Sequence, residues 1–344
     1  MADRARIVGE VAAAVGLAEG ERGVSAVLAA LARLEPVSIR HLSRAVELPV
    51  PIVASVCGEL RKRAIVAGER PAQLTPAGRR LFAGGGLSGE LRGTCPTCEG
   101  RGVHVPGGLR RGAPDLAASA AVAPGVRVDL DQCHCTVRTK LRRVLALHEA
   151  DALVGRRILL LGDDDLVSLA IASIVRRFGA GPTIAGLTVL DVDPELIGFV
   201  RPRLADAPFP AVAAEHDLRG PLPAALLRAF DTVVTDPPYT VAGARLFLSR
   251  AAEALAGPGG DVFLSFGSRR PGAALRLQRT IAESGFVIRR LARDFNEYAG
   301  AGVLGGASHL YHLVATDELR PLVTGRWEGP LYTRDEPVRA SGDR

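Results

Sequence analysis

Lysine is almost absent from this chain of 344 residues, because Lys62 and Lys140 are the only two. The 43 basic side chains are therefore nearly all arginines, in a background rich in alanine and glycine. A net charge of +6 and a pI of about 9.4 are features of nucleic-acid-binding proteins. We attribute them here to a GC-rich coding bias, and we do not expect nucleic acid as a partner.

Long hydrophobic runs are also missing. No stretch approaches the roughly 20 apolar residues of a membrane-spanning helix, and the first residues lack the charged and then apolar pattern of a signal peptide. We therefore expect a cytoplasmic protein with no membrane contact. In such a chain, five cysteines favour metal binding or burial over a disulfide framework.

Residues 1–84 predict small helices and one hairpin, in the order of a winged-helix domain. Helical apolar spacing runs from Glu21 to Leu34, Ser38 is placed to cap a second helix, and a third extends from Val53 to Arg63. Two short strands follow around Gly68. The third helix is only modestly basic, so we favour dimerisation or covering of a catalytic pocket over nucleic-acid binding.

A cysteine-bearing connector is expected over residues 85–135. Cys95 and Cys98 lie in a C-x-x-C-x-G-x-G knuckle, a pattern in which two thiolates hold one metal ion. Cys133 and Cys135 form a second pair. Together the four thiols predict a structural zinc site that fastens the connector to the core. Two pairs of buried or free thiols are the alternative.

Residues 136–316 alternate strands and helices, which predicts an α/β fold with a Rossmann-like, methyltransferase-type sheet. A polar tail is expected over 317–344. The first strand, 157–162, ends in Gly162 and then three acids, at the edge where such sheets bind ligands. A nucleoside site normally has a glycine-rich turn here, so the acids indicate a cationic ligand. A helix N-terminus favours one acid through its dipole, but this accounts poorly for three: Asp163, Asp164 and Asp165.

Three further strands end in polar residues that should reach the same edge. Asp191 and Asp193 follow the second strand, about where nucleoside-binding sheets place the acid that holds the ribose hydroxyls. Asp217 follows the third strand, and the fourth ends at Asp236. This repetition predicts a pocket at the carboxyl ends of the strands.

The run from Asp236 to Thr240, Asp-Pro-Pro-Tyr-Thr, indicates amine binding. The two prolines rigidify the turn, the acid and backbone carbonyls face an amine, and the Tyr239 ring offers a stacking or cation–π surface. Amino-group methyltransferases use such a run to hold an attacking nitrogen. A strand that merely ends at prolines is the alternative. Further on, Glu297 and Tyr298 begin a glycine-rich segment, either a loop that closes over a substrate or a plain surface loop.

The segments Gly162–Leu166 and Asp236–Thr240 resemble those of the branched-chain polyamine synthases, the bis(aminopropyl)spermidine synthases. The resemblance extends from the winged-helix-like region to about residue 316. It implies a winged-helix domain, a Rossmann-like catalytic domain and a homodimer. It also implies transfer of aminopropyl groups from decarboxylated S-adenosylmethionine to the internal nitrogen of spermidine or a similar polyamine, with release of methylthioadenosine.

Electrostatics favour the same donor. Ordinary S-adenosylmethionine carries a carboxylate that the three acids would repel, whereas the decarboxylated donor ends in an ammonium group. Asp163 and Asp165 are expected to bind this ammonium or the amine of the acceptor, and Asp164, Asp165 or Asp236 to accept the proton of that amine. The donor nucleoside is expected to contact Gly162, Asp191, Asp193 and Asp217. The substrate is expected to contact Pro237, Pro238, Tyr239 and Glu297.

Two other functions remain open on the sequence alone. An S-adenosylmethionine-dependent N-methyltransferase acting on nucleic acid explains the Asp-Pro-Pro-Tyr run, but not three acids in place of a glycine turn. A winged-helix regulator that senses a polyamine fits the domain order, but gives the acids no catalytic purpose. The electrostatic reasoning fails if Asp163, Asp164 and Asp165 turn away from any cavity or pair with arginines of the same chain.

Overall fold

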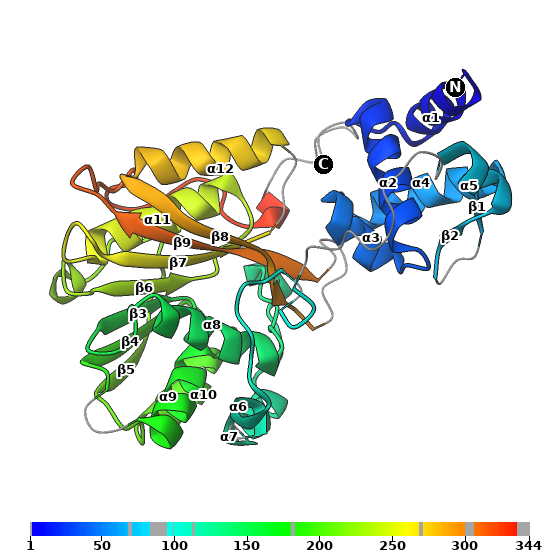
Figure 1. Cartoon of the computed structure of the whole chain (residues 1–344). Coiled ribbons are helices and arrows are strands. Elements are labelled where there is room, and N and C mark those ends of the chain that lie inside the picture. The colour runs from blue at the N-terminus through cyan, green and yellow to red at the C-terminus, as the bar shows by residue number, and fades with distance from the viewer. Residues whose placement is uncertain are drawn as a thin grey trace.

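The computed structural model describes residues 2–67, 71–82, 95–98, 100–111, 114–179, 183–267, 271–299 and 306–335. A helical amino-terminal domain lies beside an α/β domain, close to one end of its sheet (Figure 1). Among the described helices, none combines the length and apolar character needed to span a membrane.

The amino-terminal domain contains short helices and an antiparallel pair of two-residue strands, which agrees with the predicted order. Ser38 caps its helix by accepting a hydrogen bond from the His41 N–H at 3.2 Å, as expected. The helix predicted from Val53 begins three residues earlier, because Pro51 fits the first helical turn. Classification as a winged helix stays a prediction. The elements are α1 (Ala2–Val15), α2 (Gly20–Leu34), α3 (Ile39–Val46), α4 (Val50–Lys62), β1 (Val66–Ala67), β2 (Gln73–Leu74) and α5 (Pro76–Phe82).

The α/β domain is organised around a seven-stranded sheet in the order β5-β4-β3-β6-β7-β9-β8. The first five are parallel to one another, and β9 pairs antiparallel with both β7 and β8. Every strand predicted from residue 157 onward forms, although β8 continues to Glu297 instead of ending at Ala292. The strands are β3 (Arg157–Leu161), β4 (Gly186–Asp191), β5 (Ala211–Glu215), β6 (Thr232–Thr235), β7 (Asp261–Phe266), β8 (Phe286–Glu297) and β9 (Ala307–Ala315).

Helices cover both faces of this sheet (Figure 1). Side chains alternate along a strand, so Ile158 and Leu160 of β3 belong to one core, whereas Leu159 and Leu161 belong to the other. The first core contains α8 (Val137–Glu149), α9 (Val167–Phe178) and α10 (Pro194–Leu204), and the second contains α11 (Val241–Ala254) and α12 (Pro271–Glu283). Shorter helices are α6 (Gly107–Arg111), α7 (Pro114–Ala121), η1 (Val128–Leu130), η2 (Ala224–Leu226) and η3 (Thr333–Asp335).

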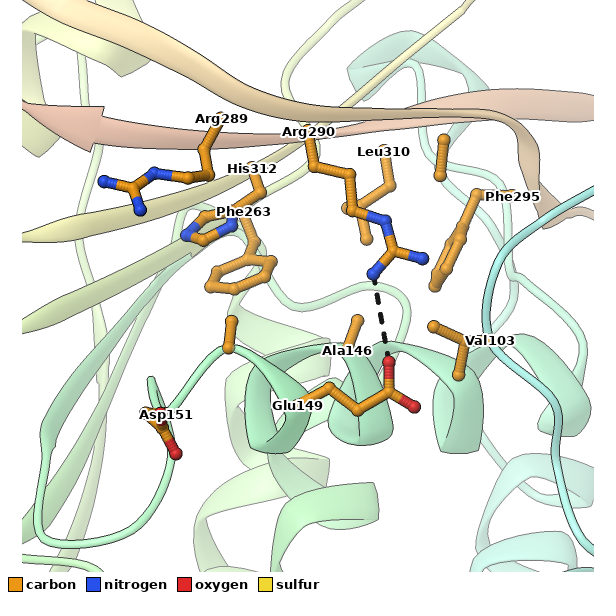
Figure 2. Close-up of a pocket in the computed structure, with 12 residues that line it drawn as sticks. Val103, Ala146, Glu149, Asp151, Phe263, Arg289, Arg290, Phe295, Leu310 and His312 are labelled. Atoms are coloured by element: carbon orange, nitrogen blue, oxygen red, sulfur yellow. Dashed lines mark ion pairs between the residues drawn. The ribbon is translucent and has the colours of Figure 1, made fainter.

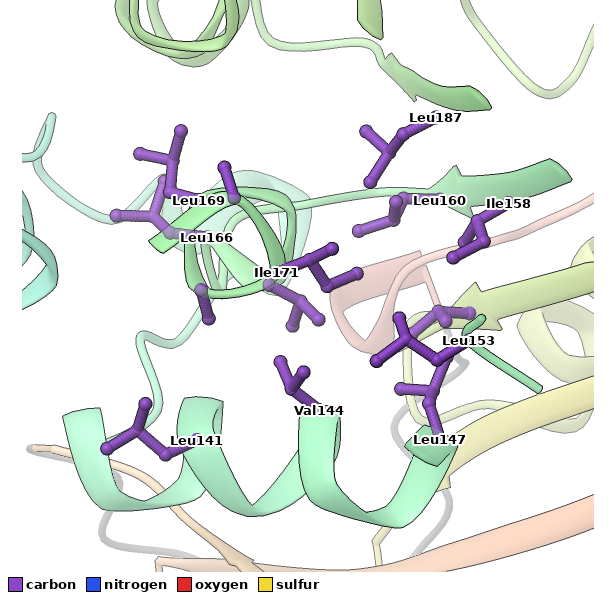
Figure 3. Close-up of a cluster of buried hydrophobic side chains, with 14 of the residues drawn as sticks. Leu141, Val144, Leu147, Leu153, Ile158, Leu160, Leu166, Leu169, Ile171 and Leu187 are labelled. Carbon is purple, nitrogen blue, oxygen red and sulfur yellow. The ribbon is translucent and has the colours of Figure 1, made fainter. Parts of the chain in front are cut away.

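Helix α8 buries both apolar and charged side chains. Leu141, Val144 and Leu147 point into the apolar cluster that contains Ile171 of α9 and Ile158 of β3 (Figure 3). The same helix also buries polar and charged side chains, at Thr139, Lys140, Arg142 and Arg143. Buried cations need anionic or hydrogen-bonding partners, and the partners of α8 lie in the candidate active site.

The segment from 317 to 335, part of the expected polar tail, packs against the α/β domain. Val323, Leu331 and Tyr332 are buried against Leu246 of α11. Fully buried Arg250, also on α11, donates hydrogen bonds to the carbonyl groups of residues 323 and 325, at 3.5 and 2.6 Å. A few apolar anchors and one buried arginine therefore hold a segment whose composition is mostly polar.

Leu160→Ala should destabilise the α/β domain by about 2–5 kcal/mol, because a fully buried side chain on the central strand would leave a cavity. The free energy of unfolding in urea measures this loss. Val212→Ala is the control, since Val212 of β5 is 59% exposed and its truncation should cost less than about 0.5 kcal/mol. Equal effects would contradict the placement of Leu160.

Candidate active site

The loops after β3 and β4 are fastened together by one carboxylate. Asp191 Oδ2 accepts the Asp163 N–H and Oδ1 accepts the Asp193 N–H, both at 2.9 Å. Gly162, between strand and loop, has φ = +79°, a conformation that glycine adopts without strain. Its N–H donates to the Leu190 carbonyl at 2.8 Å, so the chain turns sharply at the end of the sheet.

Acids from four strand ends line one pocket of about 60 Å³, as the sequence predicts for this edge of the sheet. They are Asp164 after β3, Asp191 at the end of β4, Asp217 after β5 and Asp236 after β6. We call this cavity the acid-lined pocket. The other lining residues are Leu130, Gln132, Gly162, Val192, His216, Leu218, Pro238, Phe247, Leu331 and Tyr332.

A larger cavity of about 360 Å³ lies beside the end of α8 (Figure 2). It shares no lining residue with the acid-lined pocket. Its floor is largely apolar, and three of its polar groups are paired. Arg290 lies 3.8 Å from Glu149, and His312 lies 2.7 Å from Asp261 while stacking on Phe263. The smaller, acid-lined pocket, where carboxylates from four strand ends meet, is therefore the better candidate for the active site.

Asp163 is buried outside the acid-lined pocket, contrary to its expected role in binding an ammonium group. It accepts hydrogen bonds from the backbone N–H of Ser168, at 3.2 Å, and from the Ser168 hydroxyl. Burial raises the pKa of Asp163 to about 7. The side chain therefore serves the start of α9.

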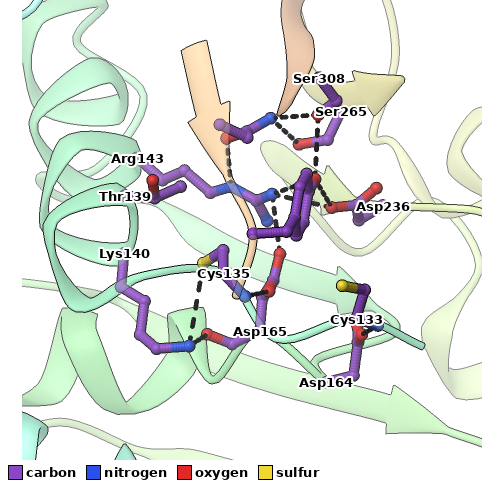
Figure 4. Close-up of polar contacts among 12 residues, drawn as sticks. Cys133, Cys135, Thr139, Lys140, Arg143, Asp164, Asp165, Asp236, Ser265 and Ser308 are labelled. Atoms are coloured by element: carbon purple, nitrogen blue, oxygen red, sulfur yellow. Dashed lines mark hydrogen bonds and ion pairs between the residues drawn. The ribbon is translucent and has the colours of Figure 1, made fainter. Parts of the chain in front are cut away.

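Asp164 and Asp165 have opposite electrostatic surroundings, since carboxylates lie near Asp164 and cations near Asp165 (Figure 4). Asp164 lines the pocket and accepts the Cys133 N–H at 3.0 Å, while burial and the neighbouring carboxylates raise its pKa well above the usual value. Asp165 lies 2.8 Å from Arg143 Nη2, and Lys140 donates to its backbone carbonyl at 2.6 Å. Burial opposes ionisation of Asp165, but Arg143 and Lys140 outweigh it and lower the pKa.

The three consecutive acids therefore do not act as one anionic patch. Asp165 is paired with an arginine of its own chain, and Asp163 is turned away from the pocket, which are the two arrangements that weaken the original electrostatic reasoning. Only Asp164 of the three lines the pocket. The anionic character of the site instead comes from acids that follow four different strands.

Asp236 is linked to a chain of polar groups behind the pocket. Its Oδ2 accepts hydrogen bonds from Arg143 Nη2 at 2.8 Å and from the Tyr298 hydroxyl at 2.6 Å. The Tyr298 hydroxyl lies 2.8 Å from that of Tyr239 and 2.9 Å from Ser308 Oγ. Burial raises the pKa of Asp236 to about 6, against the opposing effect of Arg143.

Tyr239 differs from its predicted role as a stacking surface. Its hydroxyl is engaged with Tyr298, its ring packs against Phe266 at a centroid distance of 5.2 Å, and it does not line the acid-lined pocket. Pro238 does line the pocket, whereas Pro237 is buried outside its lining.

Glu297 also differs from its predicted role in substrate binding. Its carboxylate lies 3.1 Å from Arg101, 3.2 Å from Arg142 and 3.9 Å from Arg44. These arginines belong to the connector, α8 and α3, so Glu297 joins three segments of the chain. The predicted closing loop beyond it falls mainly on residues 300–305, outside the described residues.

Asp193 and Asp217, both predicted to contact the donor nucleoside, differ in whether they line the acid-lined pocket. Asp193 is buried, caps α10 by accepting the Glu195 N–H at 3.0 Å, and accepts the Gln132 side-chain amide at 3.0 Å, so both oxygens are occupied. Of the two acids predicted to hold the ribose, only Asp191 lines the acid-lined pocket. Asp217 does line the pocket, where it is paired with Arg219 at 2.8 Å.

The four-thiol zinc site predicted from the sequence is not formed. Among the residues that the structure describes, no three Cys, His, Asp or Glu side chains are arranged to hold a metal ion. Cys135 is buried beside Lys140, 3.8 Å from its Nζ, and Cys133 lies 3.7 Å from the Ala299 carbonyl. Cys95 is exposed and Cys98 half-buried. The thiols therefore do not fit a closed tetrahedral site.

The sequence interpretation missed two residues of the site. His216 lines the pocket, and its buried Nε2 has no hydrogen-bond partner among the described residues, while burial lowers its pKa and favours the neutral ring. Its position directly before Asp217 was the available signal. Arg143 was missed because helical periodicity does not distinguish a buried arginine from an exposed one.

A mostly parallel sheet with carboxylates at four consecutive strand ends defines an α/β domain that binds a ligand at its carboxyl edge. Sequence comparison identifies the family: the branched-chain polyamine synthase A C-terminal domain matches residues 116–317. The chain belongs to the branched-chain polyamine synthase family.

Relatives support this assignment. The N(4)-bis(aminopropyl)spermidine synthase of Thermus thermophilus is 33% identical over 312 residues, covering 87% of this chain and 83% of the relative. The Thermococcus kodakarensis enzyme of the same name is 32% identical over 265 residues, with coverage of 74% and 72%. A crystal structure of the Thermus enzyme with N4-aminopropylspermidine and 5'-methylthioadenosine aligns at TM-score 0.74 and 28% identity, covering 96% of this chain and 98% of that one.

The stability of the protein should depend on pH through Asp163. Its pKa is raised by burial from 3.8 to about 7, so its contribution is fully present below about pH 4 and is lost as the pH rises through 7. Asp163→Asn stays neutral and should lose nothing over this range. The unfolding free energy of the wild type should therefore fall relative to the variant by up to about 4 kcal/mol.

Urea unfolding at a series of pH values measures this difference. Asp115→Asn is the control, because Asp115 is half-exposed and pairs only with groups outside the pocket, Ser173 and Arg176. A constant difference between wild type and Asp163→Asn from pH 4 to 8 would contradict the burial of Asp163.

Proposed function

We propose that the protein is an aminopropyltransferase that moves aminopropyl groups from decarboxylated S-adenosylmethionine to the internal nitrogen of spermidine or a similar polyamine. The products are a branched polyamine and methylthioadenosine. The observation that carries the proposal is the convergence of Asp164, Asp191, Asp217 and Asp236 on one pocket at the carboxyl edge of the sheet. The names of the relatives and the ligands in the Thermus structure support the same reaction.

The acid-lined pocket favours the decarboxylated donor over S-adenosylmethionine itself. Two like charges 4 Å apart repel by about 4 kcal/mol at an effective dielectric constant of 20. The amino-acid carboxylate of S-adenosylmethionine would meet such repulsion from Asp164 or Asp236, whereas the ammonium of the decarboxylated donor is attracted. The same reasoning favours a polyamine acceptor and disfavours methyl transfer to nucleic acid.

Asp164 is the group best placed to accept the proton of the attacking amine. It lines the pocket, its pKa is raised by burial and by neighbouring carboxylates, and no arginine or lysine of the described residues pairs with it. The amine lone pair attacks the carbon next to the sulfonium, the carbon–sulfur bond breaks toward sulfur, and the amine proton passes to Asp164. Asp165 is unsuited to this role because Arg143 and Lys140 lower its pKa, which makes the carboxylate a weak base, and because it does not line the pocket.

A second transfer to the same nitrogen gives a quaternary ammonium and releases no proton. Asp164 then acts only as a counterion, together with Asp236, whose Oδ1 remains for the pocket while Oδ2 is bound by Arg143 and Tyr298. The same two acids thus serve both products.

We assign the donor nucleoside to the opposite side of the acid-lined pocket. Asp191 at the end of β4 is placed for the ribose hydroxyls, and Asp217 and His216 after β5 for the adenine. Phe247 and Tyr332 supply apolar walls. The pocket therefore divides into an adenosine part and an amine part.

The amino-terminal domain, proposed as a winged helix, covers the catalytic domain in this scheme. Arg44 of α3 donates to the Gly306 carbonyl at 3.3 Å, and Glu47 pairs with Arg293 of β8 at 2.5 Å. These contacts support a covering role over nucleic-acid binding. A cytoplasmic homodimer is part of the same proposal.

Incubation of the purified protein with spermidine and decarboxylated S-adenosylmethionine should yield methylthioadenosine and branched products, both detected by mass spectrometry. S-adenosylmethionine in the same assay should give no methylated product. Methyl transfer would instead favour the N-methyltransferase function, and polyamine binding without turnover would favour a sensor.

Asp164→Asn should lower the rate of the first aminopropyl transfer by about 10²-fold or more, because the amine loses its proton acceptor. The rate of methylthioadenosine release measures this effect. Asp231→Asn is the matched control, since Asp231 pairs with Arg157 at the other end of the strands. A near-normal rate in Asp164→Asn would exclude this residue as the base.

A further inference from the structure

Arg143 of α8 places a guanidinium directly behind the acid-lined pocket, with a side chain that is only 3% exposed (Figure 4). Its Nη2 lies 2.8 Å from Asp165 Oδ2 and donates to Asp236 Oδ2 at 2.8 Å and to the Tyr298 hydroxyl at 3.1 Å. Its Nε donates to Asn296 Oδ1 at 2.8 Å. One cation therefore contacts acids from two separate loops, after β3 and after β6.

The orientation of this guanidinium is fixed by the sheet. Asn296 of β8 is fully buried, and its amide donates to Ser265 Oγ of β7 at 3.0 Å and to Ser308 Oγ of β9 at 2.8 Å. Because the two serines hold the amide nitrogen, the orientation of Asn296 Oδ1 is fixed, and it accepts the hydrogen bond from Arg143 Nε in that orientation. The Nη2 group of the guanidinium then faces the two carboxylates.

The two carboxylates would repel each other without this cation. Breaking a buried ion pair typically costs about 3–5 kcal/mol, because the remaining charge has no partner. Asp165 has Arg143 as its only ion-pair partner among the described residues, and its Oδ2 makes no directed hydrogen bond. Arg143 therefore holds the loop after β3 against the loop after β6.

The contacts on Asp236 also determine which of its oxygens is available. Both Arg143 and Tyr298 occupy Oδ2. Asp236 lines the pocket, whereas Arg143 does not, so Oδ1 is the oxygen left for a ligand. Arg143 itself has no access to the reacting atoms.

We propose that Arg143 is a positioning residue for the transfer reaction, which keeps Asp236 ionised and its Oδ1 directed at the ammonium groups of the polyamine acceptor. This inference rests on the proposed function for the identity of the acceptor. It assigns the binding of the acceptor cation to Asp236 and the support of that carboxylate to a residue outside the pocket.

The pH dependence of acceptor binding by Asp236 follows from the charge of Arg143. Burial raises the pKa of Asp236 to about 6, and the guanidinium opposes a further rise. Without the guanidinium, Asp236 stays protonated to a higher pH and loses its attraction for the acceptor. The neighbouring groups that also face Asp236 are Asp164, Asp165 and the hydroxyls of Tyr239 and Tyr298.

The test is the pH profile of kcat/KM for spermidine in Arg143→Gln and Arg143→Lys. Arg143→Gln should move the acidic limb upward by at least about one pH unit, so its loss of activity should be at least about threefold greater at pH 6.5 than at pH 9. Arg143→Lys retains the charge and should keep the limb near that of the wild type, at reduced kcat. Tyr298→Phe removes one hydrogen bond to Asp236 and should shift the limb in the same direction by less.

Arg142→Gln is the matched control, because Arg142 is the adjacent buried arginine of α8 and pairs with Glu297. It should lower stability without moving the acidic limb. A loss in Arg143→Gln that is equal at all pH values, or an equal shift of the limb in Arg142→Gln, would overturn the inference.

Failure of the proposed function gives a different result, since the wild type would then form no branched product. In that case calorimetric titration of spermidine into wild type and Arg143→Gln decides the inference. A dissociation constant that rises more steeply at low pH in the variant supports it, and parallel pH dependence overturns it.

Discussion

The attraction between one buried guanidinium and two carboxylates is the constraint on which the active site depends. Arg143 binds Asp165 and Asp236, and these residues lie in the turns after β3 and β6, which are neighbours at the centre of the sheet. Acids gathered this closely repel one another and resist burial. An internal cation permits the density of acids that a pocket for polycations needs. The charge pattern of α8 is therefore part of the site, even though the pocket contains no residue of that helix.

The acids consequently fall into two groups, those outside the lining of the acid-lined pocket and those that form it. Asp163, Asp165, Asp193 and Glu297 are satisfied by partners of the same chain and shape the loops. Asp164, Asp191, Asp217 and Asp236 line the pocket, although Asp191 also joins the loops after β3 and β4 and Asp217 pairs with Arg219. Sequence spacing cannot separate these groups, because consecutive residues in a tight turn point in different directions. Asp164 faces a cavity, while the acids on either side of it face a serine and an arginine.

Much of the fold was nevertheless predictable. The strands from 157 onward have short apolar runs bounded by turn residues, and their carboxyl-end acids indicated the correct edge of the sheet. The partners of the charged side chains were not predictable, because they depend on contacts between distant segments: Arg101 and Arg44 meet Glu297 from nearly 200 and more than 250 residues away. The zinc expectation failed for a related reason, since cysteine spacing does not show that Cys135 is enclosed beside Lys140.

The last segment that the structure describes completes the wall of the acid-lined pocket. Leu331 and Tyr332 form part of the pocket wall, and the Leu331 carbonyl accepts a hydrogen bond from Thr240 Oγ1 at 2.8 Å. All strands of the seven-stranded sheet precede residue 331 in the sequence, so a nascent chain that stops before residue 331 contains them but has no complete cavity. The wall against which a ligand would lie is therefore made after every strand that carries the acids.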